Sequence, residues 1–205
     1  MEGDLYCYDE SLRKKGFLCI AGLDEAGRGP LAGPVVAAAV IFSHDIRIKG
    51  LRDSKKVPEK ERAFLYEEII RFSAGIGVGT VGHEEIDRLN ILRATKLAMQ
   101  QAVENLSMRP DLLVIDAVSL PSVRIKQFSI IKGESISASI AAASIVAKCE
   151  RDKIMMEYHR QFPQYHFDKH KGYSTKDHLD MIRIYGPCPI HRKSFQRVMS
   201  LELPF

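Results

Sequence analysis

Residues 17–36 read FLCIAGLDEAGRGPLAGPVV and contain two apolar runs separated by a charged, glycine-rich turn. The first run, Phe17–Leu23, has the length of a strand and leads directly into Asp24 and Glu25. The second run, PVVAAAVIF at Pro34–Phe42, has no polar residue at all. Uninterrupted apolar runs of this length are typical of strands that are buried on both faces. The stretch therefore predicts two core strands joined by a tight turn that begins with two acids.

Three more strands are expected along the chain. The run AGIGVGTV at Ala74–Val81 alternates glycine with larger residues, which is typical of a strand that another element approaches closely. Leu112–Ile115 forms a short buried strand that ends at Asp116, and Phe128–Ile131 predicts another buried strand that ends at Lys132-Gly-Glu134.

Apolar positions three and four residues apart indicate helices between and after these strands. The longest, at about Ser135–Gln161, is rich in Ser and Ala in its first half, so it can pack very close to a sheet. The predicted helices and their apolar faces are one from Pro58 (Leu65, Ile69, Phe72), one capped by Asn90 (Ile91, Ala94, Ala98, Ala102, Leu106), the long one (Ile136, Ile140, Ala143, Ala147, Ile154, Tyr158) and one at about Thr175–Ile184. Strands interleaved with helices predict an α/β domain.

Length and composition exclude several classes of protein. The 205 residues suit a single domain, and an apolar content of 45% is too high for a disordered chain. No run approaches the length of a membrane span, and the acidic N-terminus lacks the features of a secretory signal. Four scattered cysteines read as reduced thiols, so we expect a cytoplasmic protein (Cys7, Cys19, Cys149, Cys188). A net charge of +4 permits a polyanionic partner without requiring one.

Acids follow three of the predicted strands: Asp24 with Glu25, then Asp116, then Glu134. A carboxylate beside a buried strand end is unfavourable unless it is paired, hydrogen-bonded or metal-bound. Strands of one α/β sheet tend to bring their ends to a common rim, so the acids should form a cluster. Such a cluster suits Mg²⁺ or Mn²⁺, and two such ions can hold the attacking and leaving oxygens of a phosphoryl displacement. Glu134 would also lie at the N-terminus of the long helix, which favours its ionised form.

Other sites fit the sequence less well. The glycines after the first strand do not have the spacing of a dinucleotide-binding loop, and acids occupy the turn where a pyrophosphate would bind. Neither a phosphate-binding P-loop nor the nucleophile elbow of a hydrolase is present. A zinc site is conceivable but matches no standard pattern, and surface histidines are the simpler interpretation (His166, His170, Cys188, His191).

A series of motifs covering residues 17–197 strongly resembles ribonuclease HII, the bacterial type 2 ribonuclease H. The most specific is DEAGRGPLAGPVV at Asp24–Val36. The others follow in order: Asp53–Lys56, Ala94–Met99, Val114–Asp116, Lys132–Glu134, Ala141–Lys148, His170–Thr175 and Pro189–Phe195.

The resemblance implies a fold and an activity. The fold would be an RNase H-like α/β fold, a five-stranded mixed sheet flanked by helices, in one catalytic domain over residues 1–205. The activity would be endonucleolytic hydrolysis of the RNA strand of RNA–DNA hybrids and cleavage 5′ of ribonucleotides misincorporated in duplex DNA, leaving 5′-phosphate and 3′-hydroxyl ends. A hybrid-binding module of the same fold with weak catalysis is the alternative, and the intact carboxylate set argues against it.

The resemblance also implies site residues. Asp24, Glu25 and Asp116 match the family's metal-binding acids, which would hold two Mn²⁺ or Mg²⁺ ions. The fourth position is usually Asp and is Glu134 here; a glutamate reaches one methylene further, so we expect an altered metal spacing or metal preference. Asp152 is a weaker candidate and would pair with Arg151 on the helix surface.

Substrate-binding residues follow from the same comparison. Gly27-Arg28-Gly29 matches the loop that recognises the ribonucleotide, because backbone amides beside glycines can approach a 2′-hydroxyl. Tyr173 matches the tyrosine that stacks on the sugar of the next deoxynucleotide. Basic pairs would bind backbone phosphates: Lys55 and Lys56, Lys169 and Lys171, Arg192 and Lys193.

Two features concern the ends of the chain. Many relatives carry a C-terminal helical extension that grips the duplex, whereas this chain has only a short tail after its last motif, so weaker affinity for plain duplex is expected. We expect a monomer without membrane contact. Residues Leu201–Phe205 could contact a sliding clamp, although a frayed tail is the simpler interpretation.

Overall fold

The first acidic pair lies inside a strand rather than after one. In the computed structural model, which describes residues 4–54 and 57–198, β1 spans Ile20–Ala26, three residues later than predicted. The reason is the pairing with β2, Val35–Phe42, which places Asp24 opposite Ala38 and Glu25 opposite Ala37. Pairing with a neighbour extends the strand through both acids, so their backbone is fixed by the sheet.

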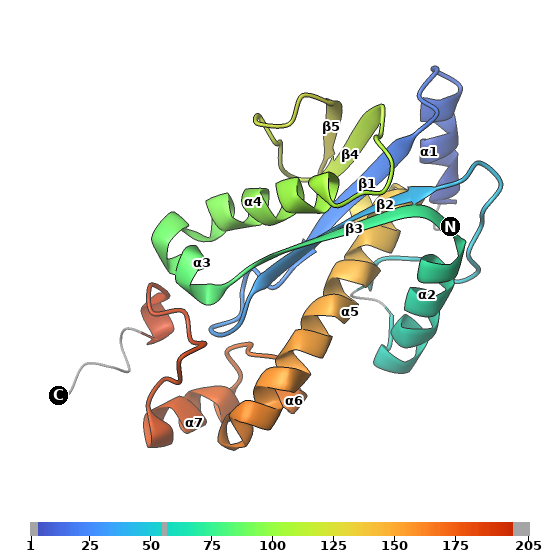
Figure 1. Ribbon diagram of the computed structural model, residues 1–205. Coiled ribbons are helices and arrows are strands. Elements are labelled where there is room, and N and C mark those ends of the chain that lie inside the picture. Colours follow the sequence, from blue (N-terminus) through green and yellow to red (C-terminus); the bar gives the residue numbers. More distant parts are fainter. Residues whose placement is uncertain (1–3, 55–56, 199–205) are drawn as a thin grey trace.

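The sheet has five strands in the order β3-β2-β1-β4-β5 and is mixed, as predicted (Figure 1). β2 pairs antiparallel with both β1 and β3, whereas β4 pairs parallel with β1, and β5 pairs parallel with β4. The remaining three strands are β3 at Ser73–Val81, β4 at Leu112–Asp116 and β5 at Lys126–Ile130. β1 is therefore the central strand, and parallel β4 lies beside it.

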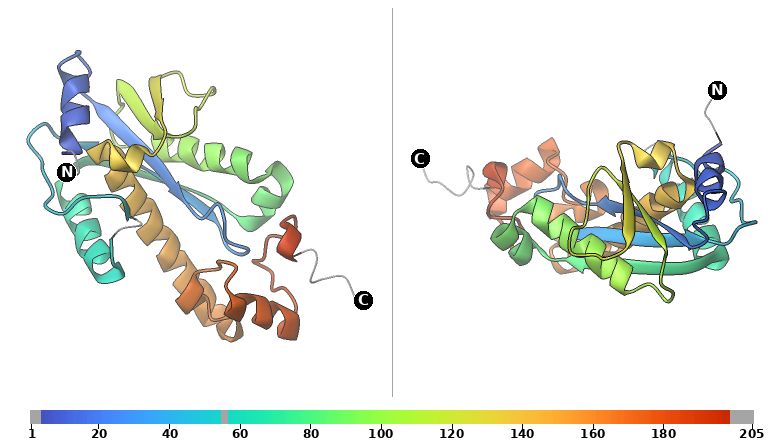
Figure 2. Two further views of the ribbon diagram at one scale, coloured as in Figure 1. Left: turned by 180° about the vertical axis from the view of Figure 1, so that it is seen from behind. Right: turned by 90° about the horizontal axis from the view of Figure 1, so that it is seen from above.

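Helices cover both faces of the sheet, α4 on one and α5 on the other (Figures 1 and 2). α2 packs against the outer side of α5. Three short helices, α1, α3 and α6, were not predicted, because each buries too few apolar side chains to show a periodic pattern. The bounds are α1 Tyr6–Arg13, α2 Glu59–Phe72, α3 His83–Leu89, α4 Ile91–Glu104, α5 Ala138–Gln161, α6 Phe167–His170 and α7 Lys176–Tyr185, with 3₁₀ turns η2 at Gly133–Ser135 and η3 at Pro163–Tyr165.

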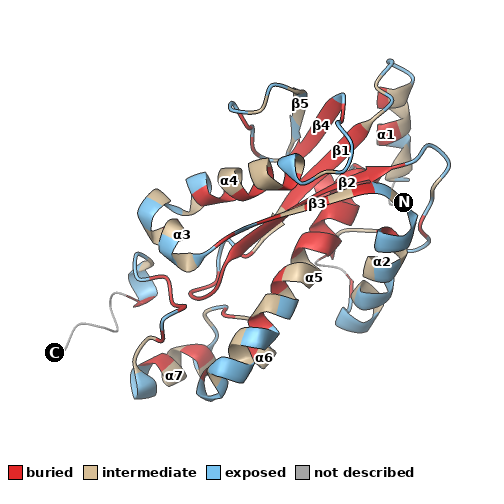
Figure 3. Ribbon diagram, in the orientation of Figure 1, coloured by how far each residue is buried: buried red, intermediate tan, exposed pale blue. Residues whose placement is uncertain are grey.

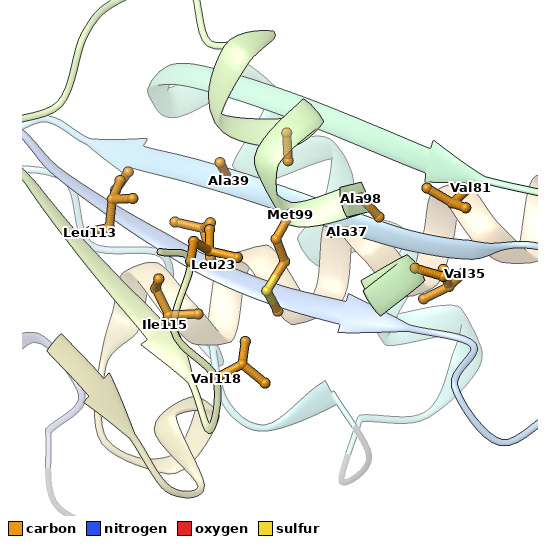
Figure 4. Packing of buried hydrophobic residues seen from close by; sticks show 14 of the residues in the cluster. Leu23, Val35, Ala37, Ala39, Val81, Ala98, Met99, Leu113, Ile115 and Val118 are labelled. Carbon is orange, nitrogen blue, oxygen red and sulfur yellow. The ribbon is translucent and has the colours of Figure 1, made fainter. Parts of the chain in front are cut away.

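The glycines of β3 let α4 lie directly on the sheet. A Cβ on Gly77 would be 2.0 Å from the carbonyl oxygen of Ala102, and one on Gly79 would be 2.0 Å from that of Ala98. The expectation that another element approaches this strand closely is confirmed. Figure 4 shows the resulting core, in which Ala98 and Met99 lie over side chains of the central strands.

The first half of α5 is buried on all sides. Every residue from Ala138 to Ala147 is buried, because the helix lies between the sheet, α1 and α2 (Figure 3). Its contact with β1 is so close that a Cβ on Gly22 would be 2.1 Å from the backbone of Ser139. Buried Asp9 of α1 accepts hydrogen bonds from the amide and hydroxyl of Ser139. The predicted close packing of the Ser- and Ala-rich segment is confirmed.

Some local predictions were wrong. The long helix begins at Ala138 instead of Ser135, because the Ser137 side chain caps it and residues 133–135 form a separate 3₁₀ turn. Phe72 and Ile136, predicted to face the core, are exposed. β5 is an edge strand and only partly buried, since nothing pairs with its outer side in the sheet.

Most of the C-terminal histidines are not on the surface. His170, His178 and His191 are buried beside Cys188, around the ring of Phe167. Within residues 4–54 and 57–198, no three acidic, histidine or cysteine side chains form a metal-binding group. The zinc interpretation therefore has no support in the described residues, and the surface interpretation holds only for His166, which is part-exposed and pairs with Asp177. Burial lowers the pKa of His178 to about 3 and that of His191 to about 4, which keeps both rings neutral.

No helix in the described part of the chain is both long enough and apolar enough to cross a membrane.

The close contact between β3 and α4 predicts that Gly79→Ala destabilises the fold. The added methyl group meets helix backbone, and overpacking of this kind lowers the free energy of unfolding by about 1–3 kcal/mol. Gly82→Ala is the matched control, because a Cβ there meets nothing within 4 Å. Urea unfolding of both variants tests this, and equal midpoints for the two would contradict it.

The buried neutral histidines predict acid sensitivity. An unfolded chain binds protons on His178 and His191 near pH 6.5, whereas the folded protein excludes the proton from His178 until about pH 3 and from His191 until about pH 4. Stability should be complete above about pH 6.5 and fall as the pH is lowered below it. The free energy of unfolding at pH 7 and pH 5 measures this effect. His191→Gln should make the dependence shallower, and an unchanged free energy in the wild type would refute it.

Candidate active site

Parallel pairing of β1 and β4 brings two acids together. Leu23 pairs with Ile115, so Asp24 and Asp116 follow as the next residues of neighbouring strands. Partnered residues of parallel strands share a face of the sheet. Asp24, Glu25 and Asp116 all line one open pocket of about 260 Å³. The structure therefore brings together three of the four predicted acids.

Asp24 is the most buried acid of the pocket, with 6% of its surface exposed. Burial raises its pKa well above the ordinary value, and the neighbouring charges of Glu25 and Asp116 raise it further. Hydrogen bonds from the Ser144 side chain and the Glu25 amide partly oppose this rise in pKa. Keeping all three carboxylates ionised therefore requires a compensating positive charge.

Glu25 and Asp116 are each held by a neighbouring group. Glu25 Oε1 lies 3.1 Å from Nη1 of Arg28, and the amide of Gly133 donates to Oδ1 of Asp116 at 2.7 Å. These contacts keep the two carboxylates directed toward protein donors.

Glu134 lies in the 3₁₀ turn η2, outside the strands that carry the other three acids. It is buried in η2, one residue after Gly133, whose amide binds Asp116. The residues that line the pocket do not include it. Its expected place at the N-terminus of the long helix is wrong, because α5 begins four residues later. Glu134 therefore directly follows the residue whose amide binds Asp116 at the end of β4, but it is not among the residues that line the pocket.

The donor set suits a hard divalent cation. All three acids of the pocket offer oxygen ligands, which Mg²⁺ and Mn²⁺ prefer, and the raised pKa of Asp24 reflects a charge repulsion that a cation would remove. Among the residues that the structure describes, no three such groups already converge on one point. The contacts of Glu25 with Arg28 and of Asp116 with Gly133 account for this separation. The residues fit such an ion in chemistry and charge.

The opposite wall of the pocket is the glycine loop, Gly27–Gly29. Gly27 has a φ of +97°, and a Cβ there would be 2.2 Å from the Arg151 side chain. Arg192 is fully buried behind the loop and donates to the carbonyls of Gly27 at 2.6 Å and Arg28 at 3.0 Å. The loop carbonyls are thus bound on the protein side while its other edge faces the pocket.

This arrangement corrects two sequence interpretations. Arg192 does not contact phosphate, because its guanidinium is fully buried among backbone carbonyls. Arg151 does not pair with Asp152, because it is buried too and donates to carbonyls. Burial lowers the pKa of Arg151 to about 10 and that of Arg192 to about 9, so both stay charged at neutral pH.

Tyr173 lies at the rim of the pocket and is 42% exposed. Its ring is 3.9 Å from the place that a Cβ on Gly29 would take. Lys169 is exposed, whereas the Lys171 ammonium donates to the carbonyl of Asp168. Neither lysine lines the pocket. Lys55 and Lys56 lie outside the described residues, as do Leu201–Phe205.

Four further side chains line the pocket without having been predicted. Ser144, which binds Asp24, also lies 2.8 Å from the hydroxyl of Ser54. The other two are Arg62 and Lys148, and both pair with Asp152. Three of the four lie in motifs of the sequence, but their polar types alone did not distinguish them from surface residues. Arg62, within the charged stretch EKER of α2, carried no signal at all.

Comparison with known proteins gives consistent matches over nearly the whole chain. The family model described as Ribonuclease HII matches residues 21–198. A Ribonuclease HII of Bacillus licheniformis is 53% identical over 195 residues, which is 95% of this chain and 76% of the relative. A Ribonuclease HII of Acetivibrio thermocellus is 50% identical over 194 residues, again 95% of this chain and 76% of the relative.

Solved structures show the same fold. The crystal structure of ribonuclease H2 from Pyrococcus horikoshii is 25% identical, with a TM-score of 0.74 over 90% of this chain and 97% of that one. RNase HII of Archaeoglobus fulgidus, solved in complex with PCNA, is 25% identical with a TM-score of 0.75, over 87% of this chain and 96% of that one. Bst-RNase HIII, crystallised with Mn²⁺, is similar in fold with a TM-score of 0.71 at 19% identity, over 90% of this chain and 69% of that one.

The predicted five-stranded mixed sheet is confirmed, and the match covers the three clustered acids and the glycine loop. The chain belongs to the ribonuclease HII family, endoribonucleases that act on RNA–DNA hybrids.

Proposed function

We propose that this chain is a metal-dependent endonuclease that hydrolyses the RNA strand of RNA–DNA hybrids. It also cuts 5′ of single ribonucleotides in duplex DNA and leaves 5′-phosphate and 3′-hydroxyl ends. The observation that carries this proposal is a pocket with clustered carboxylates on two buried strands and a backbone loop on the opposite wall. Membership of the family supports the reaction class.

The acids would act as the metal-binding residues. Asp24, Glu25 and Asp116 would hold two Mg²⁺ or Mn²⁺ ions, with Glu134 as the fourth acid in the place of the usual Asp. Bound divalent ions supply Lewis acidity to the attacking and leaving oxygens of a phosphoryl transfer. The raised pKa of Asp24 supports this assignment, because burial and the charges of Glu25 and Asp116 disfavour its ionised form, which a bound cation would stabilise.

Cationic side chains allow a phosphate to approach these acids. Arg28, Arg62 and Lys148 line the same pocket, so it is not uniformly negative. Exposed Lys169 and Lys193 would contact phosphates further along the strand, and Lys171 would do so after releasing the Asp168 carbonyl.

The glycine loop and Tyr173 would select the ribonucleotide. Gly29 has no side chain between the loop backbone and the tyrosine ring, so a sugar can reach both. A 2′-hydroxyl both donates and accepts a hydrogen bond, which permits recognition by backbone groups alone. The ring of Tyr173 would stack on the following deoxyribose, with Lys148 and Arg151 each 5.9 Å from its centroid.

We further propose a single catalytic domain that works as a monomer on nucleic acid. A clamp contact by Leu201–Phe205 stays a prediction.

Asp24→Asn should abolish cleavage and yet stabilise the protein in the absence of metal. The amide is a poor ligand for a hard cation, so kcat should fall by at least about a hundredfold. It also removes a buried charge whose pKa is raised on folding, so the melting temperature in EDTA should rise.

The assay uses a DNA duplex with one ribonucleotide, in Mn²⁺ and in Mg²⁺. Asp45→Asn is the matched control, because that carboxylate is 95% exposed. Cleavage by Asp24→Asn at the wild-type rate would exclude Asp24 from the metal site.

Glu134 can be tested separately because it lies outside the pocket wall. Glu134→Asp, which shortens the side chain by one methylene, should keep activity but change the ratio of rates in Mn²⁺ and Mg²⁺. Glu134→Ala should reduce kcat by roughly a hundredfold if the residue binds metal. Exposed Glu157→Ala serves as the control for loss of an acid. If Glu134→Ala cleaves as fast as the wild type, the fourth acid has been assigned wrongly.

A further inference from the structure

The backbone that carries Tyr173 is fixed on one side by the residues that follow the glycine loop. The amide of Leu31 donates to the carbonyl of Gly172 at 2.8 Å, and Arg151 donates to the carbonyl of Lys171 at 2.9 Å. Gly172 has a φ of +84°, and a Cβ there would be 2.8 Å from a backbone oxygen. Residues 171–173 therefore lie directly against the chain that forms the glycine loop.

On the other side the same segment is bound by a buried histidine pair, His178 and His191. Nδ1 of His178 lies 2.9 Å from the carbonyl oxygen of Tyr173, and since a carbonyl only accepts, this nitrogen carries the proton. Nε2 of the neutral His178 ring is then a bare acceptor. It faces Nε2 of His191 at 3.1 Å, so His191 donates from that atom. Nδ1 of His191 in turn accepts from the amide of Cys188 at 2.9 Å.

The opposite tautomers would not satisfy these contacts. A proton on Nδ1 of His191 could reach the carbonyl of Cys188 at 3.2 Å, but it would meet the Cys188 amide as well. The two Nε2 lone pairs of the histidine pair would then face each other in a site with no exposed surface. Unpaired polar atoms in such a site are strongly unfavourable. A single neutral arrangement therefore satisfies the whole chain of hydrogen bonds.

The histidine pair also connects Tyr173 with the arginine behind the glycine loop. His191 directly precedes Arg192, whose amide donates to the Leu31 carbonyl at 2.8 Å and whose guanidinium binds the carbonyls of Gly27 and Arg28. The two proposed substrate contacts, Tyr173 and the glycine loop, come from distant parts of the sequence and are thus both connected to the histidine pair.

We propose that His178 and His191 are positioning residues that set the distance between Tyr173 and the glycine loop, and thereby the affinity for a ribonucleotide flanked by DNA. This inference rests on the proposed function, because it concerns the substrate contacts of that site. Neither ring touches the substrate; each acts through backbone groups. A stacking contact requires the ring to be held in position to within a fraction of an ångström. Small displacements of such a binding group strongly reduce the rate of the catalysed reaction.

The tautomers can be measured without any substrate. Nitrogen-15 NMR of the histidine rings in the wild-type protein should show the proton on Nδ1 in His178 and on Nε2 in His191. Any other tautomer for either ring overturns the hydrogen-bond chain. This measurement does not depend on catalysis, so it tests the hydrogen-bond chain even if the protein cleaves no hybrid. Absence of cleavage would refute only the proposed function.

The effect on the substrate is tested by a double-mutant cycle with Tyr173→Ala. His178→Leu removes both polar contacts at similar volume, and we expect kcat/KM on a duplex with one ribonucleotide to fall roughly tenfold, mainly through KM. In the Tyr173→Ala background the same change should have an effect of less than about twofold, because the contact it positions is already absent. Equal losses in both backgrounds would overturn the proposal.

Two further variants separate positioning from stability. In His178→Asn the amide nitrogen takes about the place of Nδ1, so it can still donate to Tyr173 and should restore most of the lost affinity. Ile182→Ala lies on the same helix, is buried and removes only packing, so it should lower the melting temperature without raising KM. If Ile182→Ala raises KM as much as His178→Leu, or if His178→Asn restores nothing, the histidines have only a structural role. Should His178→Leu not fold, His178→Asn and the NMR measurement decide the question.

Discussion

The structure depends on the parallel pairing of β1 with β4, which places Asp24 beside Asp116 in the middle of a buried sheet. Burial is the main cause of the raised pKa of Asp24, and repulsion by the charges of Glu25 and, to a smaller extent, Asp116 adds to it. The neighbouring elements limit this penalty without removing it. The hydroxyl of Ser144 on α5 and the amide of Gly133 in η2 each bind one acid. Under the proposed function, this residual penalty would favour binding of a cation, so stability would be given up where the chemistry requires charge.

The same logic explains why the C-terminal part of the chain contains buried cations. A loop that recognises a sugar through its backbone presents one edge to the substrate, and its other edge must be satisfied inside the protein. Arg192 and Arg151 do this by donating to carbonyls of residues 27–34 and of Lys171. Long side chains with several donors can bind groups from separate segments at once. Their charge serves this purpose better than it would serve phosphate binding at the surface.

The sequence predicted the sheet, the four longer helices and the shared pocket of Asp24, Glu25 and Asp116, because these depend on local periodicity and on a specific motif. It placed the end of β1 three residues early, since strand ends are decided by pairing with a neighbour, here β2. It also misjudged Arg192 and the histidines, because a polar residue in a single sequence gives no sign of burial. Ser144 and Arg62 were missed for a related reason: their role arises only when α5 and α2 meet the ends of the central strands.

Glu134 lies in a short turn that belongs neither to the sheet nor to the long helix. Lys132 adopts a left-handed conformation with a φ of +58°, Gly133 follows, and α5 starts only at Ala138. The chain thus makes a separate 3₁₀ turn between β5 and α5, and the amide of Gly133 in this turn donates a hydrogen bond to Asp116. An acid in such a turn is carried by a short, separately anchored segment, whereas Asp24 and Asp116 are fixed by the sheet. As the proposed fourth acid, Glu134 would therefore reach the site from a segment outside the sheet, and the additional methylene of a glutamate would lengthen that reach.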